Sequence, residues 1–143
     1  MIVLDTNVVS EAFRKNPNAA VRAWLDARVS ADLFLCTPVL AELRYGIERL
    51  PVGARRTALE GSLSNLEMEL FDNRILSFDR ASAHEFGRIV VRRNSRGRPI
   101  ATMDALIAAI AISHRMMLAT RDTADFAELG LKLVNPFEPV SAR

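Results

Sequence analysis

The chain begins with MIVLDTN (residues 1–7), a short apolar run that ends at an aspartate. The run is too short for a helix, so it predicts a buried strand over residues 2–4. A carboxylate directly after a buried strand is costly unless something binds it. Asp5 therefore marks both the end of a first strand and a candidate site.

Similar apolar runs recur along the chain and alternate with helical patterns. This alternation predicts an α/β protein, with helices on both faces of a central parallel sheet of about five strands. We find no linker or internal repeat, so we expect one domain over residues 1–143. The predicted strands cover 2–4, 33–36, 74–78, 117–120 and 131–134, and the predicted helices cover 6–13, 18–29, 38–50, 54–71, 80–93, 102–114 and 123–128.

Two local signals refine the helices. Thr37, Asp79 and Thr102 are predicted to cap the helices that follow them, because their side-chain oxygens can accept a hydrogen bond from the first helical turn. Leucines at helical spacing predict one uninterrupted helix over residues 54–71.

Composition excludes several classes of protein. Half of the residues are hydrophobic, which excludes a disordered chain. No apolar window reaches the roughly 18 residues of a transmembrane helix, and the N-terminus lacks the basic start of a signal peptide. We therefore expect a cytoplasmic protein with no membrane partner. Cys36 is the single cysteine, which excludes an internal disulfide.

Arginine supplies 17 of the 19 basic residues. Its planar guanidinium suits phosphate partners, although codon usage in a GC-rich genome explains the bias equally well. The densest basic cluster precedes the helix predicted at 102–114, so it is a candidate for contacting nucleic-acid phosphates; a solvated helix end is the alternative. The cluster consists of Arg92, Arg93, Arg96 and Arg98.

Three further acids are expected at the same edge of the sheet as Asp5. Asp122 follows the fourth predicted strand, Glu42 lies on the helix after the second, and Asp104 lies in the first turn of the helix that leads into the fourth. In open parallel sheets, ligands bind beyond the carboxyl ends of the strands. The topology therefore brings the four acids to one rim.

Clustered carboxylates repel one another and take up protons unless a cation binds them. Mg²⁺ and Mn²⁺ prefer oxygen ligands, and a bound metal can assist hydrolysis of a phosphodiester. Each acid alone also fits a simpler role at a helix start or on a solvated helix face. The joint pattern favours a functional site.

Four segments of the chain resemble the PIN-domain ribonucleases, in particular the VapC-type toxins of toxin–antitoxin pairs and their FitB-like branch. Any one segment is a weak signal, but all four in this order and spacing are specific, and they span nearly the full length. The segments are IVLDTNV (2–8), TPVLAELRYG (37–46), TMDALIAA (102–109) and LATRDTADF (118–126).

The resemblance implies a PIN-like three-layer α/β/α fold and metal-dependent cleavage of RNA by four catalytic acids, Asp5, Glu42, Asp104 and Asp122. It implies that Asp5, Asp104 and Asp122 hold Mg²⁺ or Mn²⁺. The supporting residues that it implies are Thr6, Asn7, Thr120 and Asp125. The family also implies a homodimer, inhibition by a cognate antitoxin, and binding of operator DNA through that antitoxin.

Two other classes of function stay open. The chain is alternatively a catalytically silent PIN fold that serves as the binding subunit of a DNA-binding repressor complex, although a silent fold has no need for four acids. A small-molecule phosphatase is the other alternative. The start of the chain is similar to haloacid-dehalogenase phosphatases, but those carry a second aspartate where Asn7 stands.

Overall fold

The computed structural model describes residues 1–139 and contains five parallel strands in the order β3–β2–β1–β4–β5. The predicted α/β fold is therefore confirmed, although the predicted domain of residues 1–143 extends beyond the described residues. The edge strands are shorter than expected because each has a single neighbour to pair with. The strands are β1 (Ile2–Leu4), β2 (Leu33–Cys36), β3 (Ile75–Leu76), β4 (Met117–Ala119) and β5 (Leu133–Val134).

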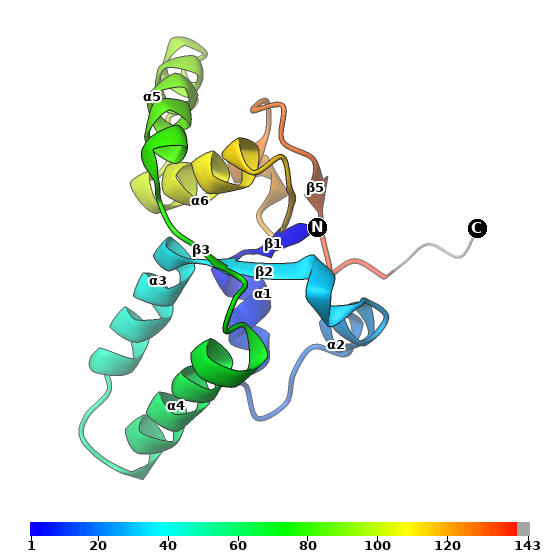
Figure 1. Cartoon of the computed structure of the whole chain (residues 1–143), viewed down its shortest axis with the longest axis vertical. Helices are drawn as coiled ribbons and strands as arrows, with labels where there is room; N and C mark the ends of the chain where they lie inside the picture. Colours follow the sequence, from blue (N-terminus) through cyan, green and yellow to red (C-terminus); the bar gives the residue numbers. More distant parts are fainter. Residues whose placement is uncertain (140–143) are drawn as a thin grey trace.

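Helices cover both faces of this sheet and make a three-layer fold. Figure 1 shows α5 and α6 on one side of the strands and α1, α3 and α4 on the other. Short 3-10 turns precede β2 and follow β4: η1 (Ser30–Asp32) and η3 (Thr123–Phe126). The helices are α1 (Thr6–Glu11), α2 (Ala19–Asp26), α3 (Thr37–Glu48), α4 (Ala54–Asn65), α5 (Arg80–Ser95) and α6 (Thr102–Ser113).

The helix predicted over 54–71 changes its geometry near the middle. After α4 the chain continues as a π-helical turn, η2 (Leu66–Leu70), in which the Phe71 N–H donates to the Leu66 carbonyl at 3.0 Å. A π turn holds more residues than an α turn, so side chains beyond it leave the apolar stripe. Leu66 is accordingly buried, whereas Leu70 is 52% exposed.

Of the three predicted helix caps, one is correct. The Asp79 side chain caps α5 by accepting a hydrogen bond from the Ser82 N–H at 2.9 Å. Thr37 and Thr102 are instead the first residues of their helices, and Cys36 and Ala101 hold the cap positions. At α3 the shift arises because β2 runs directly into the helix, so the last strand residue stands where a cap would lie.

The core is centred on α6, which lies between the sheet and α5. Five consecutive residues of this helix, 107–111, are fully buried, and Val3, Leu35 and Leu118 of the central strands are also fully buried. Burial on nearly every side explains why the helix is almost uniformly apolar. Its first turn carries Asp104 and emerges at the edge of the sheet where the site lies.

Within residues 1–139, every helix is too short or too polar to cross a membrane.

Candidate active site

Asp5 is held at the junction of β1 and α1. Leu4 pairs with Ala119 in the parallel register, and the ladder extends one step further because the Asp5 N–H donates to the Ala119 carbonyl at 2.9 Å. The Asp5 side chain also caps α1, where its Oδ1 accepts from the Thr6 N–H at 2.8 Å. The residue is only 5% exposed, so strand pairing and capping together fix one buried carboxylate.

The second oxygen of Asp5 belongs to a network that joins β1 to the end of β4. Oδ2 accepts from the Thr120 hydroxyl at 2.7 Å and from the Asn7 amide at 3.1 Å. The same amide nitrogen lies 3.0 Å from Asp122 Oδ2, and the Asp122 N–H donates to the Thr120 hydroxyl at 3.0 Å. Asn7 and Thr120 therefore hold Asp5 and Asp122 at a set spacing.

The four acids line one cleft of about 310 Å³. Glu42 reaches it from α3 and Asp104 from the first turn of α6, so the shared rim expected from the topology is present in the structure. Asp5 is buried, Glu42 and Asp104 are partly buried, and Asp122 is exposed. Asp125 lies on η3, is exposed, and stands outside the lining of the cleft.

The electrostatics of the cleft favour a bound cation. Burial, followed by the negative charges of Asp5, Asp125, Glu42 and Asp122, raises the pKa of Asp104 to about 6. Burial also raises the pKa of Asp5, although hydrogen bonds from Thr120 and Thr6 oppose the rise. The raised pKa values show that the ionised carboxylates are destabilised in the cleft. A bound cation would stabilise them in the ionised form.

Glu42 lies close to Asp5 and Thr6. Burial raises its pKa, the Thr6 hydroxyl opposes this rise, and the charge of Asp5 adds to it. That hydroxyl is buried and falls outside ordinary hydrogen-bond geometry to any partner within the described chain. The hydroxyl thus lies near the Glu42 carboxylate without a well-formed hydrogen bond, and a small shift of either side chain would complete one.

The donors suit a hydrated hard cation rather than a closed cage. Among residues 1–139, no three acid, histidine or cysteine side chains converge closely enough to hold a metal ion as they stand. Mg²⁺ typically uses one or two carboxylates and keeps several waters. An acidic cleft with an unpartnered Thr6 hydroxyl fits that mode of binding.

Four residues that were not predicted also line the cleft: Ser10, Glu11, Arg14 and Arg121. Arg121 lies beside Asp122 in one of the matched segments. Ser10 and Glu11 follow Asn7 at intervals of three and four residues, which is the spacing of one helix face and could have identified them. Arg14 stands in the turn after α1, where helical spacing does not apply.

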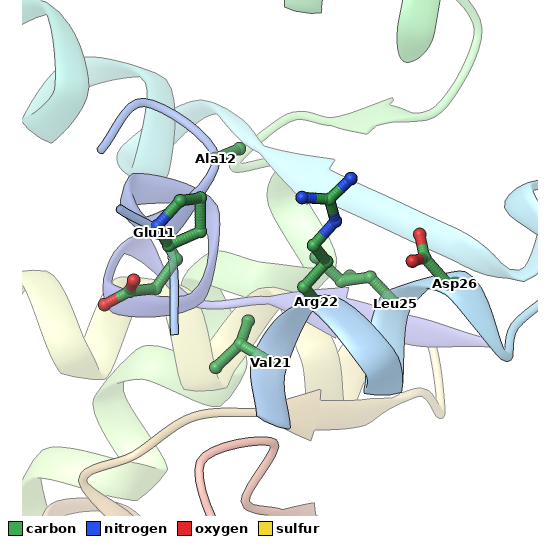
Figure 2. Close-up of a pocket in the computed structure, with 7 residues that line it drawn as sticks. Glu11, Ala12, Val21, Arg22, Leu25 and Asp26 are labelled. Carbon is green, nitrogen blue, oxygen red and sulfur yellow. The ribbon is translucent and has the colours of Figure 1, made fainter. Parts of the chain in front are cut away.

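Glu11 is a buried acid like Asp5, but its contacts give it a structural role. It is 4% exposed, its Oε2 accepts from the Asn18 N–H at 2.9 Å, and its Oε1 lies 3.5 Å from Arg14 Nε. Figure 2 shows a second hollow between α1 and α2, where the Glu11 carboxylate points away from Arg22 and Asp26. Glu11 thus ties the end of α1 to the start of α2.

The four arginines of the predicted RNA-binding cluster do not share one exposed surface, because one of them is buried. Arg93 is 5% exposed, and its guanidinium donates to the carbonyls of Arg98 at 2.6 Å, Asp125 at 2.6 Å and Ala127 at 3.2 Å. A buried side chain with these partners cannot reach RNA, so the structure corrects the expectation for Arg93. Arg92, Arg96 and Arg98 are exposed.

Cys36 lies at the end of β2, near the site, without taking part in it. The residue is fully buried, and burial raises the pKa of its thiol to about 12. The nucleophilic and metal-binding form of cysteine is the thiolate. Cys36 therefore remains a protonated core residue at neutral pH.

A doubly covered parallel sheet with an acidic cleft at its carboxyl edge defines an α/β protein built around a polar site on the β1 and β4 ends. The sequence matches the family described as PIN domain over residues 2–132, and the chain belongs to the PIN-domain family.

Relatives in that family match the chain along almost its whole length. The VapC ribonuclease Y4jK of Sinorhizobium fredii is 40% identical, covering 97% of this chain and 99% of the relative. Toxin FitB of Neisseria gonorrhoeae is 39% identical, covering 96% and 99%. The solved structure of FitAB bound to an IR36 DNA fragment superposes with a TM-score of 0.92 at 37% identity, covering 100% of both chains.

Proposed function

We propose that this protein is a metal-dependent endoribonuclease that acts as the toxin of a toxin–antitoxin pair. The observation that carries the proposal is the convergence of Asp5, Glu42, Asp104 and Asp122 on one cleft. The names of the relatives, VapC ribonuclease and toxin FitB, support the same activity. Phosphodiester hydrolysis suits these acids because a cation held by them counters the charge of the phosphate.

Each acid has a role in this proposal. Asp5, Asp104 and Asp122 would hold Mg²⁺ or Mn²⁺, and the bound ion would supply charge neutralisation and activation of water. Asn7 and Thr120 keep Asp5 oriented through one carboxylate oxygen. Glu42, whose pKa is raised by burial, accepts the proton that the attacking water loses.

Thr6 and Asp125 complete the proposed site. The Thr6 hydroxyl, which has no partner within the described chain, donates a hydrogen bond to a water or to a phosphate oxygen in the cleft. Asp125 acts from outside the lining, through its charge on Asp104. This is a weaker role than that of the four acids.

The partners follow from the same relatives. The FitAB structure contains a DNA fragment, and we propose that this chain likewise binds an antitoxin and reaches operator DNA through it. The homodimer expected from the family belongs to the proposal, as does a cytoplasmic location where RNA is available. Size-exclusion chromatography with light scattering would measure the dimer, and a measured monomer mass would remove that part.

The test is cleavage of RNA by the purified protein in Mg²⁺, in Mn²⁺ and in EDTA. We expect cleavage with either metal, none in EDTA, and about a thousandfold less from Asp5→Asn or Asp104→Asn. The matched control is Asp72→Asn, which alters an exposed acid remote from the cleft lining. Activity that survives EDTA, or that is equal in all variants, would reject the mechanism.

One observation favours the alternative of a catalytically silent binding subunit. The FitAB structure was solved bound to a DNA fragment, and DNA binding is the role expected of such a subunit. Titration calorimetry with Mn²⁺ separates the two proposals. An absence of Mn²⁺ binding by protein that still binds its antitoxin would favour the silent subunit.

A further inference from the structure

We infer that Arg14 and Arg121, which line the cleft beside the acids, bind RNA phosphates and position the substrate there. The inference rests on the proposed function for the identity of the substrate. It replaces the basic cluster at 92–98 with two arginines that belong to the cleft itself.

The cleft needs cations of its own to accept a polyanion. Its lining includes Asp5, Glu42, Asp104 and Asp122, which repel RNA phosphates on either side of the scissile bond. Proteins bind nucleic-acid backbones mainly through arginine and lysine contacts to phosphate oxygens. Arginine suits this role because its planar fork can engage two phosphate oxygens together.

Arg14 and Arg121 lie in the cleft lining and come from separate elements. Arg14 stands in the turn after α1, and Arg121 stands between β4 and η3. Their side chains are 64% and 52% exposed, so both guanidinium groups face solvent. Phosphates that approach the acids therefore meet one arginine from each element.

Each arginine forms only a long ion pair with its neighbouring acid. Arg14 Nε lies 3.5 Å from Glu11 Oε1, and Arg121 Nε lies 3.9 Å from Asp122 Oδ1. By contrast, the exposed pair Arg88–Glu85 closes to 2.6 Å. Separations beyond ordinary hydrogen-bond length leave the guanidinium N–H groups available for phosphate oxygens.

Arg121 is also preorganised. Its backbone N–H donates to Asn7 Oδ1 at 3.2 Å, which ties its position to the residue that bridges Asp5 and Asp122. Its guanidinium packs over the Phe137 ring, 5.0 Å from the ring centre. Stacking holds the plane of the group while its edges, which carry the donors, remain open.

The cluster at 92–98 is less suited to this role. Arg93 is buried, and its guanidinium donates to the carbonyls of Arg98, Asp125 and Ala127. Within the described chain, the lining of the cleft includes none of these arginines. They flank η3 rather than the acids, so their exposed members at most extend the path of the RNA.

The test measures binding of a fluorescently labelled single-stranded RNA in EDTA, where the proposed cleavage is off. We expect Arg14→Gln and Arg121→Gln each to raise Kd about tenfold, and the double variant to raise it further. Each should also reduce the slope of log Kd against log salt by about 0.7, the value for one phosphate contact on a single strand. In Mg²⁺, KM should rise while kcat changes little.

The matched control is Arg88→Gln, which removes an arginine of similar exposure (69%) that also pairs three residues back with a glutamate. It should leave Kd and the salt slope unchanged. Arg121→Lys keeps the charge and should recover part of the affinity. Circular dichroism melting curves confirm that each variant is folded.

The outcomes separate this inference from the proposed function. If the variants of Arg14 and Arg121 match Arg88→Gln in Kd and salt slope, the proposed phosphate binding by these two arginines is wrong, even if the wild type cleaves RNA. A wild type that binds no RNA would overturn it too. If RNA is bound through both arginines but is not cleaved, phosphate binding by the arginines is supported and the proposed ribonuclease activity is rejected.

Discussion

Two junctions of the molecule share one local design and differ in chemistry. At β1–α1 and at β3–α5, an aspartate follows a strand and caps the next helix: Asp5 accepts from the Thr6 N–H and Asp79 from the Ser82 N–H. Asp5 is 5% exposed among other acids, whereas Asp79 is exposed. Burial raises the pKa of Asp5, while hydrogen bonds from the Ser82 N–H and hydroxyl lower the pKa of Asp79.

The difference shows that a capping motif alone does not distinguish a structural acid from a functional one. Asp79 is satisfied by its own helix and by a Ser82 hydroxyl that also lies 3.0 Å from Ser113. Asp5 is held by groups from another strand and has other acids within electrostatic reach. Surroundings that oppose ionisation make Asp5 the candidate for a functional role.

The largest expected effect is loss of activity in Asp5→Asn. We expect RNA cleavage to fall about a thousandfold, as when a key electrostatic group is removed from an active site. The melting temperature should shift by only a few degrees, because asparagine also caps helices well. Single-turnover cleavage and calorimetry measure the two effects; a variant that unfolds instead would assign Asp5 a structural role.

The next effect concerns the segment that carries Asp125 beside the site. Arg93→Met leaves the carbonyls of Arg98, Asp125 and Ala127 without their shared donor. We expect a loss of about 2–4 kcal/mol in the free energy of unfolding, since buried polar groups lose their partner. Urea denaturation measures it, with Arg92→Met as the exposed neighbouring control.

A smaller effect should appear in the pH dependence of the metal-free protein. The pKa of Asp104 is raised to about 6, and those of Asp5 and Glu42 are raised as well. The folded state therefore binds more protons than the unfolded state, so these groups make the protein less stable as pH rises from about 4 to about 6. Melting temperatures in EDTA should fall over this interval.

The metal provides the control for that prediction. Added Mg²⁺ should raise the melting temperature more at pH 7.5 than at pH 5, because protons compete with the cation for the same oxygens. A melting curve with the same pH profile in Mg²⁺ and in EDTA would contradict a metal site at these acids. Asp104→Asn should flatten the EDTA profile.

The smallest effect is expected at the other junction. Asp79→Ala should lower the melting temperature by a few degrees and leave RNA cleavage unchanged, because it removes a cap but no part of the cleft. Because the pKa of Asp79 is lowered in the folded state, the pH dependence of its contribution to stability is opposite in sign to that of Asp5. The stabilisation from Asp79 is present above its unfolded pKa near 4 and is lost as pH falls through its lower folded value.

The convergence of the acids could be predicted because all strands of a parallel sheet have their carboxyl ends at the same edge. Asp5 and Asp122 follow adjacent strands, and Asp104 opens a helix that leads into one of them. Arg93 could not be predicted, because its burial depends on carbonyls more than 30 residues away and no local pattern records such a contact. Arg14 was missed because it lies in the turn after α1, where no periodic pattern shows which side chains face the cleft.

The network around Asn7 has a consequence for biosynthesis. It joins residues 5 and 7 to residues 120 and 122, which are separated by more than 110 positions along the chain. A nascent chain therefore cannot assemble the cleft until β4 and the turn after it have been synthesised. Contacts of such long sequence separation also form late in folding. The proposed nuclease activity can thus arise only after translation has passed Asp122.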